Sequence, residues 1–244
     1  MRENHFTEPI ARGYDASTTE EFEPDVIAAT VDFLAHVAGP GPALEFAIGT
    51  GRIALPLSGR GVRLQGIDLS PAMVAQLQAK PGADAIDVTI GDIAETKVDG
   101  AFSLVYLVYN TIGNLGTQDA QVACFCNAAA HLEPGGCFVI EVGIPQLQRL
   151  PPGETVRPFL ITEKHLGFDE IDVTTQQSFS HHYFASDRGF ERWSMPWRYV
   201  WPSELDLMAR IAGMELRERW SDWDRAPFTR HSHKHISVWE KPVA

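Results

Sequence analysis

Short apolar runs alternate with helical segments along the first 142 residues, and this rhythm restricts the possible folds more than any other feature of the chain. Such an alternation favours a parallel sheet with helices on both faces. Ser70 is the expected N-cap of one helix, with Pro71 at its first position. Strands are expected at 43–47, 62–67, 86–90, 102–108 and 137–142, and helices at 24–37, 50–57, from 71 onward and at 118–132.

The rhythm changes in the second half of the chain. Residues 143–165 are rich in proline and are expected to be irregular. Residues 168–200 are rich in Thr, Phe, Tyr and Trp, which favours an antiparallel excursion. The chain is interpreted as a single domain with four parts: an N-terminal arm at 1–22, a core at 43–142, an insertion at 143–200 and a closing part at 201–244.

The closing part is expected to contain one helix and two strands. The helix should begin with Ser203 as its cap and end at Gly213. The strands at 214–220 and 235–241 are too close together for a helical crossover, so they should pair as a hairpin. The prediction is a parallel sheet with an antiparallel edge.

A glycine-rich turn follows the first strand, in the segment LEFAIGTGR at 44–52. Its glycines let a ligand lie against bare backbone, and the helix that follows presents free N–H groups. Asp68 ends the second strand, where its carboxylate can accept hydrogen bonds from both hydroxyl groups of a ribose. The expected ligand site therefore lies at the carboxyl ends of the strands and suits cofactors that contain adenosine.

Two classes of cofactor fit this pattern. The stretch Gly49–Ala54, followed by Asp68, also matches the loose dinucleotide fingerprint, so an NAD(P)-dependent oxidoreductase is an alternative. Glu45 favours the other class, because an acid before the turn would crowd a pyrophosphate but suits the ammonium group of a methionine moiety. Asp92 follows the third strand and could accept a hydrogen bond from an adenine amino group. The Tyr-x-x-x-Lys pair of short-chain dehydrogenases is absent from the sequence.

Together these motifs resemble the class I S-adenosylmethionine (SAM)-dependent methyltransferase superfamily. The resemblance covers residues 43–142 and rests on LEFAIGTGRIALPL, GIDLSPAMV, GDI, FSLVYLVYNTIGNL and HLEPGGCFVIEV, in that order. It implies a Rossmann-like α/β fold with a seven-stranded, mostly parallel sheet, an antiparallel last strand and helices on both faces. It also implies SAM as the methyl donor and S-adenosylhomocysteine (SAH) as the product.

The resemblance assigns residues to the cofactor. Val108, Tyr109 and Asn110 are expected to line the methyl-transfer site, and Tyr14 is similar to a lid tyrosine of small-molecule members. The residues expected from the methionine end, through the ribose, to the adenine are Glu45, Ala47, Gly49, Arg52, Asp68, Leu69, Met73, Asp92 and Ile93. Two positions depart from the family pattern: Ala47 replaces the usual first glycine, which we expect to be a mild change, and Ile48 replaces the usual next small residue.

The expected reaction is in-line transfer of a methyl group to a nitrogen or oxygen atom of a small-molecule metabolite, in which positioning supplies much of the catalysis. No general base is evident; Tyr14 and His182 are the candidate catalytic residues. His181 and His182 are adjacent, so at most one can face a site on a strand. The arm and the insertion are expected to build the acceptor pocket. The layout is similar to small N-methyltransferases of amino sugars and other metabolites, which often form homodimers.

Composition narrows the partners and the location. The formal net charge of −12 and the lack of a basic patch disfavour nucleic acid. No secretory signal or apolar run of membrane-spanning length is present, so a cytoplasmic protein is expected. Three cysteines do not form a disulfide framework. The alternating His231, His233 and His235 could share a strand face, but a polar loop is the favoured interpretation and no metal is expected. A non-catalytic SAM-binding protein and a protein or RNA methyltransferase are further alternatives.

Overall fold

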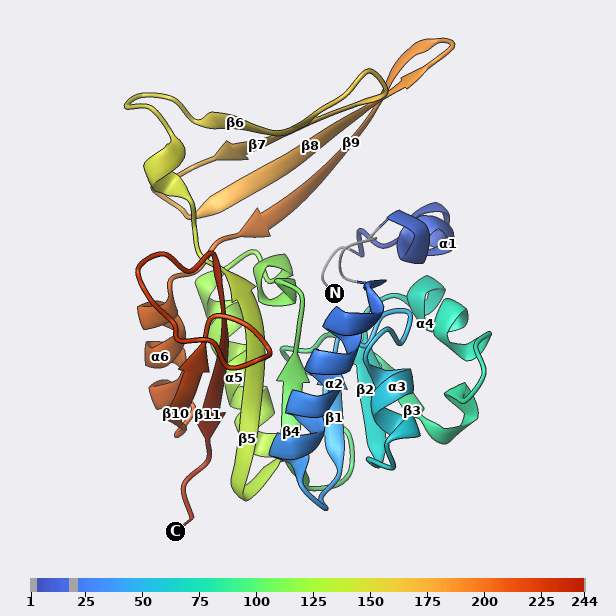
Figure 1. Cartoon of the computed structure of the whole chain (residues 1–244), viewed down its shortest axis with the longest axis vertical. Helices are drawn as coiled ribbons and strands as arrows, with labels where there is room; N and C mark the ends of the chain where they lie inside the picture. Colours follow the sequence, from blue (N-terminus) through green and yellow to red (C-terminus); the bar gives the residue numbers. More distant parts are fainter. Residues whose placement is uncertain (1–3, 18–21, 244) are drawn as a thin grey trace.

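The computed structural model describes residues 4–17 and 22–243. Its main sheet has seven strands in the order β10-β11-β5-β4-β1-β2-β3 (Figure 1). β11 (Lys234–Glu240) runs antiparallel to both neighbours, β5 and β10 (Glu215–Trp220), and the other neighbouring strands are parallel. The predicted fold class and closing hairpin are therefore confirmed. The remaining strands are β1 (Ala43–Phe46), β2 (Leu64–Asp68), β3 (Asp87–Ile90), β4 (Phe102–Leu107) and β5 (Leu132–Gly143).

Two apolar clusters cover the two faces of this sheet. Leu104 and Tyr106 of β4 belong to one cluster, and Val105 and Leu107 to the other, as the period of two along a strand requires. The first cluster contains residues of α2 (Pro24–Ala38), α3 (Ala54–Gly59) and α4 (Pro71–Gln78), and the second contains residues of α5 (Gln118–His131) and α6 (Pro202–Ile211). Within residues 4–17 and 22–243, each helix is too short or too polar to span a bilayer.

Two helix starts test the predicted caps. The Ser70 hydroxyl group accepts a hydrogen bond from the Met73 N–H at 3.2 Å, so the prediction for α4 is confirmed. The predicted cap of the last helix is wrong. The N-cap lies two residues earlier, at Trp201, which makes no side-chain hydrogen bond, and α6 begins at Pro202. A proline at the first helical position needs no N–H partner and has a suitable φ, so it sets this boundary in place of Ser203.

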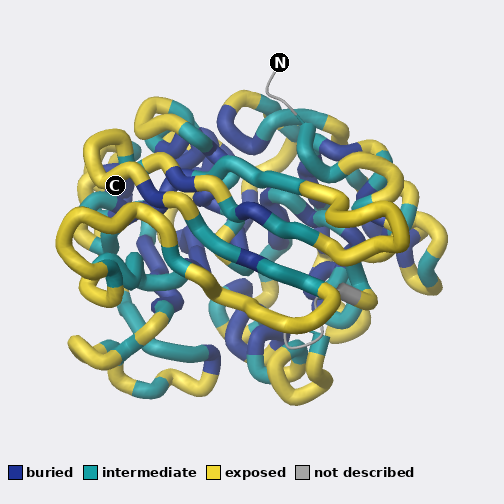
Figure 2. Tube along the Cα trace, turned by 90° about the horizontal axis from the view of Figure 1, so that it is seen from above, coloured by how far each residue is buried: buried dark blue, intermediate teal, exposed yellow. Residues whose placement is uncertain are grey.

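The insertion forms a separate four-stranded antiparallel sheet of β6 (Val156–Ile161), β7 (His165–Ile171), β8 (Gln177–Ser186) and β9 (Gly189–Arg198). The predicted antiparallel excursion is confirmed, but residues 143–165 are not all irregular. Pro158 lies in β6, which is an edge strand and is irregular between Pro158 and Leu160; such positions tolerate proline. The sheet lies above the carboxyl ends of the core strands, with β9 nearest the core (Figure 1). Seen from above, its strands are mostly exposed or half-buried (Figure 2).

Arg198, at the end of β9, joins this upper sheet to the core. Its side chain is buried and donates hydrogen bonds to Gln121 of α5, Glu204 of α6 and Gln176 in the turn before β8. A buried guanidinium group must be paired in this way, because an unpaired one would be strongly destabilising. The insertion is therefore held at a defined position over the strand ends.

The turn after β1 contains both departures from the family pattern, Ala47 and Ile48. Ala47, Gly49 and Gly51 have φ values of 55°, 58° and 80°, so α3 starts only at Ala54 and not at residue 50. A positive φ strains the backbone of Ala47 but not that of a glycine. The side chain of Ile48 fills the space beside Gly66 in β2, where an added Cβ would lie 2.4 Å from the Ile48 Cδ1.

Gly66→Ala should lower the free energy of unfolding by about 1–3 kcal/mol, because the new methyl group overlaps Ile48. Adding Ile48→Val removes the closest contact, so the loss in the double variant should be smaller than the sum of the single losses. Urea unfolding measures all three variants. Gly59→Ala is the control, since its Cβ meets no atom within 4 Å, and it should be neutral or slightly stabilising. A Gly66→Ala variant as stable as the wild type would show that the space is not filled.

Candidate functional site

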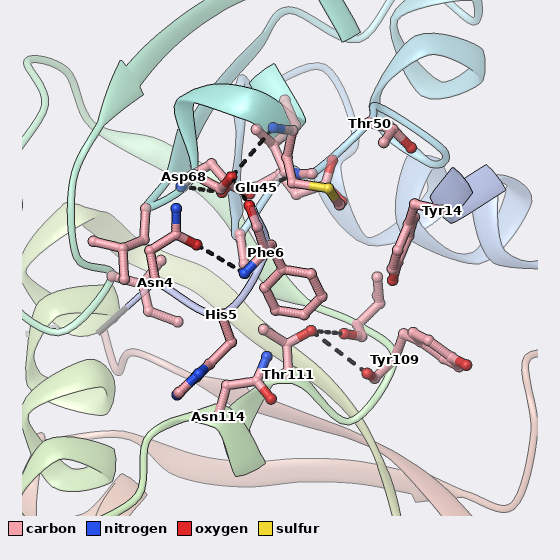
Figure 3. Close-up of a pocket in the computed structure, with 18 of the residues that line it drawn as sticks. Asn4, His5, Phe6, Tyr14, Glu45, Thr50, Asp68, Tyr109, Thr111 and Asn114 are labelled. Atoms are coloured by element: carbon pink, nitrogen blue, oxygen red, sulfur yellow. Dashed lines mark hydrogen bonds between the residues drawn. The ribbon is translucent and has the colours of Figure 1, made fainter. Parts of the chain in front are cut away.

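A cavity opens at the carboxyl ends of the core strands, with about 970 Å³ of empty space, part of it open to solvent. Its walls come from the N-terminal segment, the turn after β1, the ends of β2 and β4, and Met195 of β9 (Figure 3). Asn110 is the single residue assigned to the cofactor that does not line it. The assigned residues that do are Tyr14, Glu45, Ala47, Gly49, Arg52, Asp68, Leu69, Met73, Asp92, Ile93, Val108 and Tyr109.

Glu45 lies at the base of this cavity and is 3% exposed. It is directly opposite Tyr106 in the register of β1 and β4, and the Tyr106 hydroxyl group donates a hydrogen bond to its Oε2 at 2.8 Å. Burial raises the pKa of Glu45 to about 8, although the Tyr106 hydrogen bond and the nearby Arg52 lower it. At neutral pH this carboxyl group is therefore mostly protonated, and a cation placed beside it would favour its charged form.

Asp68 holds the turn in place while it faces the cavity. Its Oδ2 accepts a hydrogen bond from the Gly49 N–H at 2.7 Å, and its Oδ1 accepts one from the Ser70 N–H at 2.8 Å. Burial raises the pKa of Asp68, and these two hydrogen bonds lower it. Each oxygen of a carboxylate has a second acceptor position, so Asp68 can still accept from two hydroxyl groups of a ligand.

The third acid, Asp92, lies after β3. Its Oδ1 accepts a hydrogen bond from the Ala94 N–H at 2.9 Å, which fixes the carboxylate beside Ile93. Leu69, Met73 and Ile93 are largely buried apolar residues that line the same part of the cavity. The arrangement combines an apolar slot with a carboxylate at its edge, which suits a flat heterocycle that carries an amino group.

The N-terminal arm contains a helix, α1 (Glu8–Ser17), that lies beside α4 (Figure 1) and contributes Tyr14 to the lining of the cavity. Asp15 connects it to the core: the Thr50 hydroxyl group donates to Asp15 Oδ1 at 2.6 Å, and Lys80 Nζ lies 2.6 Å from Oδ2. The Ser70 hydroxyl group also donates to the Phe6 carbonyl at 2.6 Å. These polar contacts link the arm to the two turns that carry the ligand-facing groups.

The end of β4 has an unusual backbone. Tyr109 and Asn110 both have a φ of 57°, a region that is strained for tyrosine and better tolerated by asparagine. Glu141 of β5 holds both residues: its Oε2 accepts from the Tyr109 N–H at 3.1 Å, and its carbonyl accepts from the Asn110 N–H at 3.1 Å. The turn carries Asn110 away from the first cavity and into a second one. Strained residues that persist in this way concentrate at functional sites.

The second cavity has about 630 Å³ of empty space and adjoins the first. Arg52 and Tyr109 line both cavities. Its other lining residues are Val26, Asn110, Glu141, Gly143, Trp223 and Lys234. The predicted grouping of residues 108–110 at one site is therefore divided between two adjacent cavities.

The candidate base His182 lines neither cavity. It lies on β8 with its Nδ1 2.9 Å from the Nε2 of His165, and burial, followed by the charges of His165 and His181, lowers its pKa to about 4. The ring of His181 contacts Ser194 and Glu170 instead.

The three alternating histidines do not share a strand face. Only His235 belongs to β11, and His231 and His233 precede that strand. The part of the chain that the structure describes contains no cluster of His, Cys, Asp or Glu suited to a metal ion.

Sequence reasoning missed several cavity residues. Glu141 lines the second cavity, and Tyr106 lines neither cavity but donates a hydrogen bond to Glu45. Both are polar residues within apolar strands, and that signal could have identified them. Four further cavity residues lie in the quoted motifs without having been assigned, and they are Thr50, Thr111, Asn114 and Leu115. Others come from segments with no motif, among them Asn4, His5, Phe6, Met195, Trp223 and Lys234.

Comparisons with known proteins identify the family. A family model described as a methyltransferase domain matches residues 43–136. The structure of the CcbJ methyltransferase from Streptomyces caelestis is 32% identical, covers 100% of both chains and superposes with a TM-score of 0.87. The cypemycin N-terminal methyltransferase of a Streptomyces species is 24% identical over 93% of this chain and 97% of that protein.

A more distant structure shares the fold. It is SAM-bound CalS10, an amino pentose methyltransferase from Micromonospora echinaspora, with a TM-score of 0.69 and 19% identity over 99% of this chain and 100% of that chain. The full-length match at 32% identity is the stronger finding, because it extends over the arm, the core and the insertion together. The chain belongs to the class I SAM-dependent methyltransferases.

Proposed function

We propose that the first cavity binds SAM through three carboxyl groups, those of Glu45, Asp68 and Asp92. Glu45 takes the ammonium group of the methionine moiety, Asp68 takes the two ribose hydroxyl groups, and Asp92 takes the adenine amino group. The observation that carries this assignment is that three acids, which lie at or just after the carboxyl ends of three neighbouring strands, line one cavity. Leu69 and Met73 flank the base, and the α1 helix with Tyr14 covers the cofactor.

The donor and acceptor set favours SAM over a dinucleotide. A pyrophosphate would bring negative charge close to Asp68 and would disfavour the charged form of the buried Glu45, whereas an ammonium group beside Glu45 would favour that charged form. The Gly49 N–H, which a phosphate would need, already donates to Asp68. These contacts support the methyl donor over a dinucleotide.

We further propose that the acceptor is a nitrogen or oxygen atom of a small-molecule metabolite. When bound, SAM supplies a methyl group on a positively charged sulfur, which is electrophilic without further activation. The protein then has to hold the acceptor in line and exclude water. The relatives named for an N-terminal and an amino pentose methyltransferase favour nitrogen, and a neutral amine needs no general base in the cavity. The net charge of −12 supports a small acceptor over nucleic acid.

Calorimetric titration with SAM, SAH and NADH tests the cofactor assignment. The wild type should bind SAM and SAH but not NADH. Asp68→Ala should weaken SAM binding by roughly 30- to 100-fold, since it removes two hydrogen bonds to a charged group, worth about 2–3 kcal/mol together. Asp99→Ala, an exposed acid outside the cavity, is the control and should bind like the wild type. NADH binding by the wild type, or unchanged SAM binding by Asp68→Ala, would contradict the assignment.

Release of the cofactor should depend on the contact between α1 and the core. Asp15→Ala removes the links to Thr50 and Lys80, so SAM should dissociate roughly two- to tenfold faster, as expected for a partly exposed ion pair with one hydrogen bond. Stopped-flow tryptophan fluorescence measures this rate. Arg60→Ala breaks the exposed pair with Asp32 instead and should leave the rate unchanged. Equal dissociation rates in Asp15→Ala and the wild type would show that α1 does not retain the cofactor.

A further inference from the structure

We infer that the second cavity is the subsite for a neutral, hydroxyl-bearing part of the methyl acceptor, recognised by Glu141, Asn110 and Lys234. The inference rests on the proposed SAM site, because it places the acceptor beside the methionine end of that cofactor. Arg52 and Tyr109 form the wall that the two cavities share. The second cavity has about 630 Å³ of empty space, part of it open to solvent.

Glu141 is the acceptor group of this subsite. It lies near the end of β5 and is 8% exposed. Its Oε1 accepts from Lys234 Nζ at 2.7 Å and from the Trp223 indole N–H at 3.2 Å, and its Oε2 accepts from the Tyr109 N–H. Two bonds fill Oε1, whereas Oε2 can accept one more. A ligand donor therefore has a defined position on a carboxylate that the protein already orients.

Asn110 supplies a donor. Its Oδ1 accepts from the Gly143 N–H at 2.5 Å, so the NH₂ group is the part of the carboxamide that can serve a ligand. The strained φ values of Tyr109 and Asn110 place this side chain between the ends of β4 and β5. Straightening that turn would relieve the strain but remove the carboxamide from the cavity. The strained turn therefore places the Asn110 carboxamide at the second cavity.

Charge balance decides the chemistry of the ligand. Lys234 and Glu141 neutralise each other at 2.7 Å, and Arg52 lies against the rings of Phe22 and Tyr109. An anionic group would be repelled by Glu141 and a cationic group by Lys234, so either would compete with this ion pair. A hydroxyl group can accept from Asn110 or Lys234 and donate to Glu141 Oε2 at once. The subsite therefore fits a neutral diol or polyol portion of the acceptor.

Saturation-transfer difference NMR on the SAH-saturated protein tests this inference with three probes of similar size. Methyl α-D-glucopyranoside is neutral, D-glucuronate is anionic and D-glucosamine is cationic at pH 6.5. The neutral probe should bind most tightly. Val26→Trp fills the cavity and should weaken its binding at least tenfold. Val243→Trp, an exposed site near Gly135 at the opposite end of the sheet, is the matched control and should leave it unchanged.

Two charge variants separate recognition from general packing. Glu141→Gln should move the preference toward D-glucuronate, because Lys234 loses its counter-charge, and Lys234→Met should move it toward D-glucosamine. A merely structural role would weaken all three probes alike. Absence of binding by the neutral probe, an unchanged affinity in Val26→Trp, or an unaltered preference in both charge variants overturns the subsite.

Calorimetry with SAH on the same samples distinguishes the two proposals. Wild-type protein that fails to bind SAH counts against the SAM site. SAH binding that persists while the neutral probe fails counts against the second cavity alone. Retained SAH affinity in Val26→Trp also shows that this variant is folded.

Discussion

Glu45, the next-to-last residue of β1, has a carboxyl group that is almost fully buried and hydrogen-bonded to the Tyr106 hydroxyl group of the neighbouring strand. A carboxyl group in such a position is costly in its charged form, and its pKa of about 8 records that cost. The parallel sheet places Asp68 on the neighbouring strand, β2. Asp68 is slightly more exposed than Glu45, and its side chain accepts hydrogen bonds from two backbone N–H groups. The site thus contains one acid, Glu45, whose charged form a bound cation would stabilise, and another, Asp68, that hydrogen bonds already orient toward ligand hydroxyl groups.

The rest of the molecule positions the carboxyl ends of β1 and β2, where these two acids lie. Apolar clusters on both faces fix the strands, and the Asp68–Gly49 hydrogen bond fixes the turn over them. The arm reaches the turn through Asp15, and Arg198 holds the upper sheet above the cavity. The acceptor side depends in turn on the strained pair Tyr109 and Asn110, which Glu141 holds from β5. Both proposed ligands therefore meet groups whose orientation is set by hydrogen bonds within the protein.

The sequence predicted the core well because its signals are local. Apolar runs, the Ser70-Pro71 cap and the acids at strand ends each depend on neighbouring residues, and the structure places these acids around one cavity. Features set by tertiary context were missed. Pro158 favoured an irregular segment in the sequence, although it lies in the edge strand β6. The positive φ values of Tyr109 and Asn110 turn the chain so that Asn110 lies outside the first cavity. The Glu141–Lys234 pair joins residues 93 positions apart, which no local pattern reveals.

The most direct test of this account counts the protons released when SAH binds. Calorimetry at pH 7, in buffers with different ionisation enthalpies, gives that number. With a pKa of about 8, Glu45 is mostly protonated at pH 7 before binding, so pairing with the SAH ammonium group should release most of one proton per site. Glu45→Gln should release none. A wild type that binds SAH without releasing a proton, or a Glu45→Gln variant that releases as many, would contradict the pairing of this carboxyl group with the cofactor.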